Sequence, residues 1–294
     1  MGARDPPVTT RIVEPHLSAG ELGRFLEIQN LGLNLPFALA FLLLAAHGAP
    51  PLVPTVLLVI AFVAARNAGH SFNRWADRDL DARNPRTQGR ALVTGRISPS
   101  LALGICALSG GVLLLAAYLL NPVALALAPL ALLLVLGYSL TKRRTYLTTL
   151  FLGLVESVTP AAVYIGLTGT LPLPVYFAVG GLFAWGTAFE TIHSLGDLGT
   201  DRALGLPSLP QRLGVRASVA LVPGLHASAL ALLALYGWME RLPLPYFLGL
   251  AAMAVLASLV DRSVARTPDR VLGAFRAHFV LGALFLAGAA LSVT

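Results

Sequence analysis

Long apolar runs separated by short polar connections dominate the chain. They cover residues 32–48, 52–75, 99–120, 123–141, 146–168, 174–196, 215–238, 244–264 and 270–292. A membrane-spanning helix needs about 20 mostly apolar residues, and the segments "HGAPP", "TGTLPLP" and "RLPLP" carry the glycines and prolines that end helices. The alternation typical of β-barrel strands does not occur. The pattern predicts an all-α polytopic membrane protein with nine transmembrane helices around a central cavity and polar loops capping the cytoplasmic side.

The composition supports this class. Of 294 residues, 56% are hydrophobic and 12% are charged, and the mean hydropathy is +0.75, whereas ordinary globular domains carry about 25% charged residues. The net charge is +7, but the basic residues lie in short loops between apolar runs. That arrangement orients a protein in a membrane and attracts phosphate groups. We therefore expect contacts with membrane lipid and no nucleic-acid partner.

The basic residues also predict the topology. Every second connection between apolar runs is rich in basic residues, whereas the other connections contain one basic residue in total, Arg241. The basic set is Arg78, Arg83, Arg86, Arg90, Arg96, Lys142, Arg143, Arg144, Arg202, Arg212, Arg216, Arg262 and Arg266. The positive-inside rule places this set and the N-terminus in the cytoplasm, and nine crossings then place the C-terminus outside.

The first residues are polar and precede the apolar runs. We expect residues 1–18 to form a cytosolic tail without a cleavable signal peptide, because no apolar core is present there. Residues 19–294 are expected to form a single membrane-embedded domain. Just before the first run, apolar residues such as Leu22, Phe25 and Leu26 alternate with charged ones at helical spacing, which predicts an amphipathic segment lying on the membrane surface.

A first polar cluster begins inside the second run. Asn73, Asp77 and Asp81 are spaced four apart, so they project from one face of a helix, and Arg66 lies seven residues before Asn73 on nearly the same face. The loop that follows adds Arg86 and Arg90. Residues away from this face are expected to be solvated or to face lipid headgroups, namely Arg74, Arg78 and Asp79.

A second polar cluster begins inside the sixth run. Glu190, His193, Asp197 and Asp201 are separated by three, four and four residues and therefore share one helix face. Tyr138 and Lys142, four apart at the end of the fourth run, form a third polar face at the same side of the membrane.

Clustered carboxylates repel each other unless a cation lies among them, and carboxylate and amide oxygens suit Mg²⁺. Arginine and lysine side chains nearby would neutralise phosphate oxygens. Glu156, near the middle of the fifth run, is either a functional residue or a hydrogen-bonded structural one.

Three segments carry a family resemblance. "NRWADRDLDARNPRTQGRAL", which contains Asn73, Asp77 and Asp81, resembles the first signature of the UbiA superfamily of membrane-embedded aromatic prenyltransferases. "YSLTKRRTYLTTLFLG" is similar to the family's Tyr–Lys–Arg segment, and "ETIHSLGDLGTDRALGLPS" resembles its second aspartate-rich signature, which includes Ser208. "NLPFALA" in the first run also resembles the family's opening. Four departures bear on the acceptor: Glu190, His193, Pro207 and Thr149 stand where Asp, Tyr, Lys and Gln are frequent.

The resemblance implies a chemistry and a set of residues for it. The family moves a prenyl group from an isoprenyl diphosphate to a ring carbon of an aromatic acid acceptor with Mg²⁺ as cofactor. By resemblance, Asp77, Asp197, Lys142 and Arg143 are catalytic. The implied metal ligands are Asn73, Asp77, Asp81, Asp197 and Asp201. The implied substrate-binding residues are Arg66, Arg86, Arg90, Tyr138, Lys142, Arg143, Glu190, His193 and Ser208.

The sequence leaves open the identity of the acceptor and one other class of membrane protein. Among acceptors, 4-hydroxybenzoate in quinone biosynthesis comes first, a dihydroxynaphthoate of the menaquinone branch is close behind, and a non-quinone acceptor is a third choice. A secondary transporter also has many spans and intramembrane charge, but transporters place ionisable groups near the bilayer midplane. Here most of them lie toward the cytoplasmic ends of the runs. Prenyl chain length and oligomeric state are not fixed by the sequence.

Overall fold

The structure is a computed structural model that describes residues 18–268 and 271–294. Of the predicted polar tail, all but Ser18 lies outside the described residues. Within these ranges the secondary structure is entirely helical, and nine helices are long and apolar enough to cross a membrane. The predicted fold class is confirmed. The long helices are α2 (Leu31–Ala45), α3 (Leu52–Ala76), α5 (Pro99–Leu120), α6 (Pro122–Thr141), α7 (Thr148–Thr168), α8 (Leu173–Leu204), α10 (Val215–Met239), α11 (Leu244–Arg266) and α12 (Leu272–Leu291).

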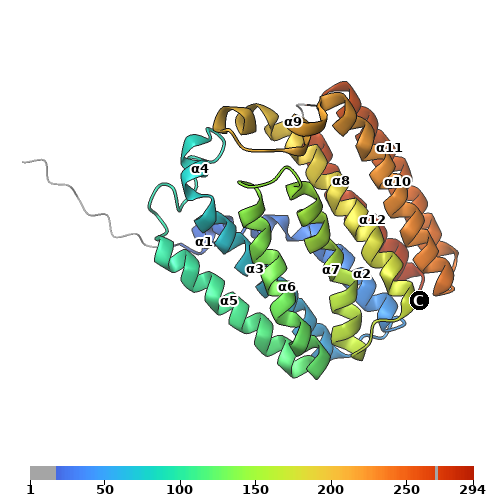
Figure 1. The fold of residues 1–294 in the computed structure, drawn as a ribbon. Coiled ribbons are helices and arrows are strands. Elements are labelled where there is room, and N and C mark those ends of the chain that lie inside the picture. The colour runs from blue at the N-terminus through green and yellow to red at the C-terminus, as the bar shows by residue number, and fades with distance from the viewer. Residues whose placement is uncertain (1–17, 269–270) are drawn as a thin grey trace, which may run out of the picture.

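Four short helices complete the chain: α1 (Ala19–Phe25), the 3₁₀ turn η1 (Ile28–Asn30), α4 (Arg78–Arg83) and α9 (Leu209–Leu213). Helices α4 and α9 lie in the connections at one end of the bundle, at the top of Figure 1. The C-terminus lies at the opposite end. The two loops that carry the predicted polar clusters therefore meet on one side of the molecule.

Local sequence explains where the helices begin and end. The carbonyl oxygen of the Asn121 side chain accepts a hydrogen bond from the Ala124 N–H at 2.9 Å, and Pro122 occupies the first turn, where its missing N–H costs nothing. The Asn121 amide also donates to the Ile165 carbonyl at 2.7 Å and so ties α6 to α7. Helix α8 ends at Gly205, which has a φ of 67° that glycine adopts without strain.

Helix α8 extends beyond its apolar run. The apolar run covers 174–196, whereas the helix spans 32 residues and ends at Leu204. The polar spacing had predicted this extension, since it placed Asp197 and Asp201 on the same helix as Glu190 and His193. Both aspartates lie on α8, and their spacing of four keeps them on one face.

The helices pack as two connected groups (Figure 1). Helix α3 packs against α5 and α6, and α7 joins this group to α8. On the other side α8 packs against α10, α10 against α11, α11 against α12, and α12 against α2. The larger apolar core lies in this second group around Phe41, Trp185, Tyr236 and Phe285. Many leucines and valines on the outer surface are exposed, as lipid-facing side chains are.

The segment before the first span is not a free surface helix. Phe25 and Leu26 are buried, and they pack against Leu92, Ile97 and Ala102 of the loop after α4 and the start of α5. The prediction of an amphipathic segment lying on the membrane surface is therefore wrong for its apolar side. That side covers the loop after α4 instead, so the segment from α1 to η1 acts as a strap across this end of the bundle.

Candidate functional site

One large cavity opens among helices α2, α3, α6, α7 and α8, with a volume of about 570 Å³. One end is lined by charged and polar side chains, and the remaining walls are mostly apolar, with Leu42, Leu58, Phe62, Leu113 and Val163 among them. Most of the predicted site residues line this cavity. They are Arg66, Asn73, Asp77, Asp81, Arg86, Arg90, Tyr138, Lys142, Glu190, His193 and Asp197.

The first aspartate cluster keeps one face although the helix does not continue straight. Helix α3 ends at Ala76 and α4 begins at Arg78, but the Asp77 and Asp81 N–H groups donate to the carbonyls four residues earlier at 2.8 Å each. Asp77 and Asp81 are both buried. The Asn73 amide donates to Asp77 Oδ2 at 3.1 Å, while Asp77 Oδ1 is buried and has no hydrogen-bond partner among the described residues.

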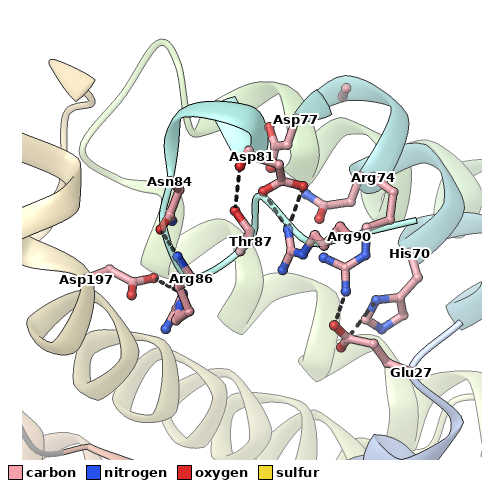
Figure 2. Close-up of polar contacts among 12 residues, drawn as sticks. Glu27, His70, Arg74, Asp77, Asp81, Asn84, Arg86, Thr87, Arg90 and Asp197 are labelled. Carbon is pink, nitrogen blue, oxygen red and sulfur yellow. Dashed lines mark hydrogen bonds and ion pairs between the residues drawn. The ribbon is translucent and has the colours of Figure 1, made fainter. Parts of the chain in front are cut away.

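The loop after α4 connects the two aspartate clusters (Figure 2). The Arg90 guanidinium donates to both oxygens of Asp81 at 2.6 Å, and Arg86 donates to Asp197 Oδ2 on α8 at 2.8 Å. The Thr87 hydroxyl donates to the Asp81 carbonyl at 3.1 Å, and the Arg86 N–H donates to Asn84 Oδ1 at 2.9 Å. Two arginines are thus held beside the carboxylates at the polar end of the cavity.

The polar face of α8 is less uniform than its spacing suggests. Glu190 lies 3.4 Å from the Tyr138 hydroxyl and 3.6 Å from His193 Nδ1. Asp201 and Ser208 are buried but line a second, smaller pocket of about 50 Å³. That pocket also touches Tyr138, Lys142, Glu190 and Asp197, so it adjoins the large cavity.

Arg143 is the one predicted site residue that lines neither pocket. Its guanidinium donates to the Ala76 carbonyl at the end of α3. In this geometry Arg143 secures the α6–α7 connection to the end of α3, next to Asp77, rather than facing the cavity.

The donor set at the polar end has room for a cation. Burial raises the pKa of Asp77, and the nearby Asp81 raises it further, while Lys142 and Arg143 oppose the shift. Within the described ranges no group of three or more His, Cys, Asp or Glu side chains is arranged as a complete metal site. Mg²⁺ typically takes only one or two carboxylates and completes its shell with water and substrate phosphate. The unpartnered Asp77 oxygen and the adjacent Asn73 amide suit such a partial ligand set.

The sequence patterns did not predict a buried ion-pair cluster that lies beside the cavity (Figure 2). Arg74 is buried and forms an ion pair with Glu27, and His70 Nδ1 lies 3.8 Å from the same carboxylate. Arg66 donates to the Leu26 and Glu27 carbonyls at 2.8 and 3.0 Å. The prediction that Arg74 is solvated or faces headgroups is therefore wrong. Arg78 and Asp79 are exposed, as expected.

The helical spacing of the basic residues could have predicted one side of this cluster. Arg66, His70 and Arg74 are four apart, like the aspartates, and so share a face of α3. Their partner Glu27 comes from the strap and has a φ of 51°, in the left-handed region that few non-glycine residues adopt. Burial alone would raise the pKa of Glu27, but the positive charge of Arg74, with His70, outweighs it and holds the pKa below its usual value.

The fold and the cavity define a polytopic membrane protein with an interior site that is charged at one end and apolar elsewhere. The UbiA prenyltransferase family matches residues 34–280. The 4-hydroxybenzoate octaprenyltransferase of Shewanella woodyi is 32% identical over 211 residues, which cover 71% of this chain and 73% of that protein. The chain therefore belongs to the UbiA prenyltransferase family, and it is an aromatic prenyltransferase of the membrane.

Solved structures agree with this assignment. A UbiA homolog from Aeropyrum pernix K1 superposes with a TM-score of 0.80 at 31% identity and covers 89% of this chain and 97% of its own. A UbiA homolog from Archaeoglobus fulgidus, solved with GPP and Mg²⁺, has the same fold at a TM-score of 0.73 and 19% identity, with coverages of 93% and 99%.

Proposed function

We propose that the protein transfers a prenyl group from an isoprenyl diphosphate to a ring carbon of 4-hydroxybenzoate, in a Mg²⁺-dependent step of quinone biosynthesis. The observation that carries the proposal is one large cavity, in which carboxylates, arginines and a lysine gather at one end and mostly apolar walls make up the rest. A prenyl diphosphate has the same division between a charged head and a long apolar tail.

The carboxylates are proposed to hold the metal. Asn73, Asp77 and Asp197 line the polar end together, and Asp77 Oδ1 is without a partner among the described residues. We assign supporting roles to Asp81, Glu190 and Asp201, with Asp201 acting from the adjoining pocket. A Mg²⁺ ion held by these residues would offset the negative charge that develops on the diphosphate as the prenyl carbon–oxygen bond breaks.

The basic side chains are proposed to bind the diphosphate. Arg86, Arg90 and Lys142 line the same end of the cavity, and the two arginines already hydrogen-bond carboxylate oxygens, whose geometry resembles that of phosphate. Arg143 supports this site by fixing the end of α3, since its guanidinium is occupied by the Ala76 carbonyl. Charge held in place before the reaction costs no reorganisation when the leaving group departs.

The remaining cavity is proposed to hold the acceptor and the tail. Apolar walls exclude water, which would otherwise capture the allylic cation. Arg66 and His193 face this space and would contact the acceptor, with Arg66 on its carboxylate. Tyr138 and Ser208 complete the proposed substrate site, Tyr138 from both pockets and Ser208 from the smaller one.

The membrane orientation is part of the proposal. The connections at the charged end carry most of the basic loop residues, which the positive-inside rule assigns to the cytoplasm. The site then opens to the cytoplasm, where soluble substrates arrive, with the N-terminus on the same side and the C-terminus outside.

A purified sample tests the proposal directly. The protein in lipid nanodiscs is given geranyl diphosphate, Mg²⁺ and either 4-hydroxybenzoate or 1,4-dihydroxy-2-naphthoate, and products are identified by mass spectrometry. We expect prenylated 4-hydroxybenzoate, and a loss of at least about 100-fold on Asp77→Ala or Asp197→Ala, because one metal contact contributes several kcal/mol. Asp79→Ala, at an exposed position beside Asp77, serves as the matched control.

Each alternative has its own outcome in this assay. A product formed only from the naphthoate would assign the protein to the menaquinone branch. The absence of any prenylated aromatic product, or full activity in both aspartate variants, would refute the proposal.

A further inference from the structure

A carboxyl group outside the two aspartate clusters lines the same cavity. Glu156 lies on α7, eight residues from the start of the helix, and is partly buried. Its Oε1 accepts a hydrogen bond from the Asn34 amide of α2 at 2.6 Å. Both Glu156 and Asn34 line the cavity, together with the apolar side chains of Leu35, Leu152 and Val155. An ionisable group this deep in a membrane protein needs a reason to be there.

Glu156 differs from the cavity's paired carboxylates. Glu27, Asp81 and Asp197 each form an ion pair with an arginine. Across the described part of the chain, no lysine, arginine or histidine forms an ion pair with Glu156. Its second oxygen makes no hydrogen bond there and is not sealed from the cavity either. One oxygen is held by Asn34, and the other is free to meet a substrate.

The position is built by close packing behind the side chain. Gly186 of α8 lies against Glu156, and a Cβ added to Gly186 would lie 2.9 Å from Glu156 Cβ and Cγ and 3.1 Å from Gly153 Cα. Only glycine at this position leaves room for the glutamate stem. The contact fixes the stem against α8, and the hydrogen bond to Asn34 ties the carboxyl to α2. A carboxyl held at two points can present one oxygen in a constant direction.

We propose that Glu156 accepts a hydrogen bond from the phenolic hydroxyl of the aromatic acceptor and takes its proton as the ring is alkylated. The inference rests on the proposed function, which places an acceptor ring in this cavity with its carboxylate toward Arg66. A 4-hydroxybenzoate has its hydroxyl at the opposite end of the ring from its carboxylate. It therefore needs one cation and one hydrogen-bond acceptor in the same cavity, and Arg66 and Glu156 supply this pair.

The step balances without another reagent. The prenyl carbon–oxygen bond breaks and its electron pair leaves with the diphosphate, while a ring carbon beside the hydroxyl forms the new carbon–carbon bond. The phenolic proton passes to the Glu156 carboxylate, which gives a neutral ring ketone. The proton on the alkylated ring carbon then passes to the departed diphosphate. Glu156 returns its proton to the ring oxygen, and the carboxylate is restored.

The proposed role of Glu156 predicts how much the reaction rate depends on it. A neutral phenol is a weak carbon nucleophile, and removing its proton raises the electron density of the ring. A positioned general base typically contributes about 10²–10⁴-fold. Asn34 is a positioning residue in this scheme, because it orients the Glu156 carboxyl without touching the acceptor.

The test compares Glu156→Gln with wild-type protein in the nanodisc assay. The glutamine side chain keeps the shape and the contact with Asn34 but cannot take a proton. We expect kcat for 4-hydroxybenzoate to fall about 100-fold or more, with KM changed by less than about 5-fold. Glu240→Gln, at the end of α10 on the other side of the bundle, is the matched control and should leave kcat unchanged.

A second acceptor separates proton transfer from a structural effect. 3-Fluoro-4-hydroxybenzoate has a more acidic phenol and keeps one free ring carbon beside the hydroxyl. Assayed at a pH above the pKa of its phenol but below that of 4-hydroxybenzoate, it has no phenolic proton to give up. With it, the Glu156→Gln defect should shrink to about 10-fold or less. A merely structural role would reduce both acceptors equally.

Each outcome is decisive. If Glu156→Gln retains wild-type kcat, or if the two acceptors are affected alike, the inference is overturned while the proposed function stands. If wild-type protein prenylates neither acceptor, the proposed function fails and takes the inference with it. Activity in wild type that depends on Asp77, together with an acceptor-dependent defect in Glu156→Gln, supports both.

Discussion

The ion pair between Glu27 and Arg74 should contribute strongly to the stability of the charged end of the bundle. In Glu27→Gln, the buried Arg74 charge loses its partner, and breaking one side of a buried pair typically costs about 3–5 kcal/mol. The Arg74 side chain is 8% exposed and that of Glu27 is 23% exposed. Water can reach the glutamate in part, so we expect a cost somewhat below this range, about 2–3 kcal/mol. For a chain of this size that corresponds to a fall in apparent unfolding temperature of roughly 5–10 °C.

The assay is thermal unfolding of the detergent-solubilised protein, followed for three variants. Glu27→Gln should lose the most stability, and the double variant Glu27→Gln/Arg74→Met should recover part of it because no unpaired charge remains. Arg78→Met, one turn further along but exposed, should change the free energy of unfolding by less than about 0.5 kcal/mol. Equal stability of Glu27→Gln and wild type, or a double variant less stable than Glu27→Gln, would refute the reasoning.

Contacts of Glu27, Gly186 and Asp261 should each change the stability of the protein in a measurable way. The pKa of Glu27 is held below its usual value of 4.5, so the ionised carboxylate stabilises the fold above pH 4.5. As the pH falls below 4.5, the difference in unfolding temperature between wild type and Glu27→Gln should shrink, which a pH series of melting curves measures. Gly186→Ala should lower the unfolding temperature because its new Cβ meets Glu156, whereas Gly199→Ala on the same helix, with nothing within 4 Å, should not; equal melting curves would contradict this. Asp261→Leu should destabilise the protein by about 1–3 kcal/mol, since it removes the 2.8 Å partner of the buried His226 ring, and an unchanged melting curve would exclude that role.

The spans and the polar clusters could be predicted from the sequence because both depend on local rules. Helix length and proline or glycine punctuation gave spans whose ends differ from the observed ones by few residues, as at 52–75 against Leu52–Ala76. Spacing by four placed Asn73, Asp77 and Asp81 on one face even though the chain bends at Asp77. The apolar run ends at residue 196, but the spacing of Glu190, His193, Asp197 and Asp201 predicted that the helix continues past it, as α8 does.

Contacts between distant segments could not be predicted. The partner of Arg74 comes from Glu27, 47 residues earlier, and the partner of Glu156 from Asn34, 122 residues earlier. No periodicity links such pairs, since they depend on how α2 and the strap dock onto α3 and α7. Arg86 and Arg90 were predicted near phosphate, but their pairing with Asp197 and Asp81 follows from the path of the loop after α4.

Asp77 and its neighbours are proposed to bind a metal together with a prenyl diphosphate. Isothermal titration with a non-reactive prenyl thiolodiphosphate, with and without Mg²⁺, measures this binding without relying on turnover. We predict binding that requires Mg²⁺ in wild type and in the exposed control Asp79→Asn, and that weakens at least about 100-fold in Asp77→Asn. Binding that is independent of Mg²⁺, or equal in Asp77→Asn and Asp79→Asn, would contradict the account.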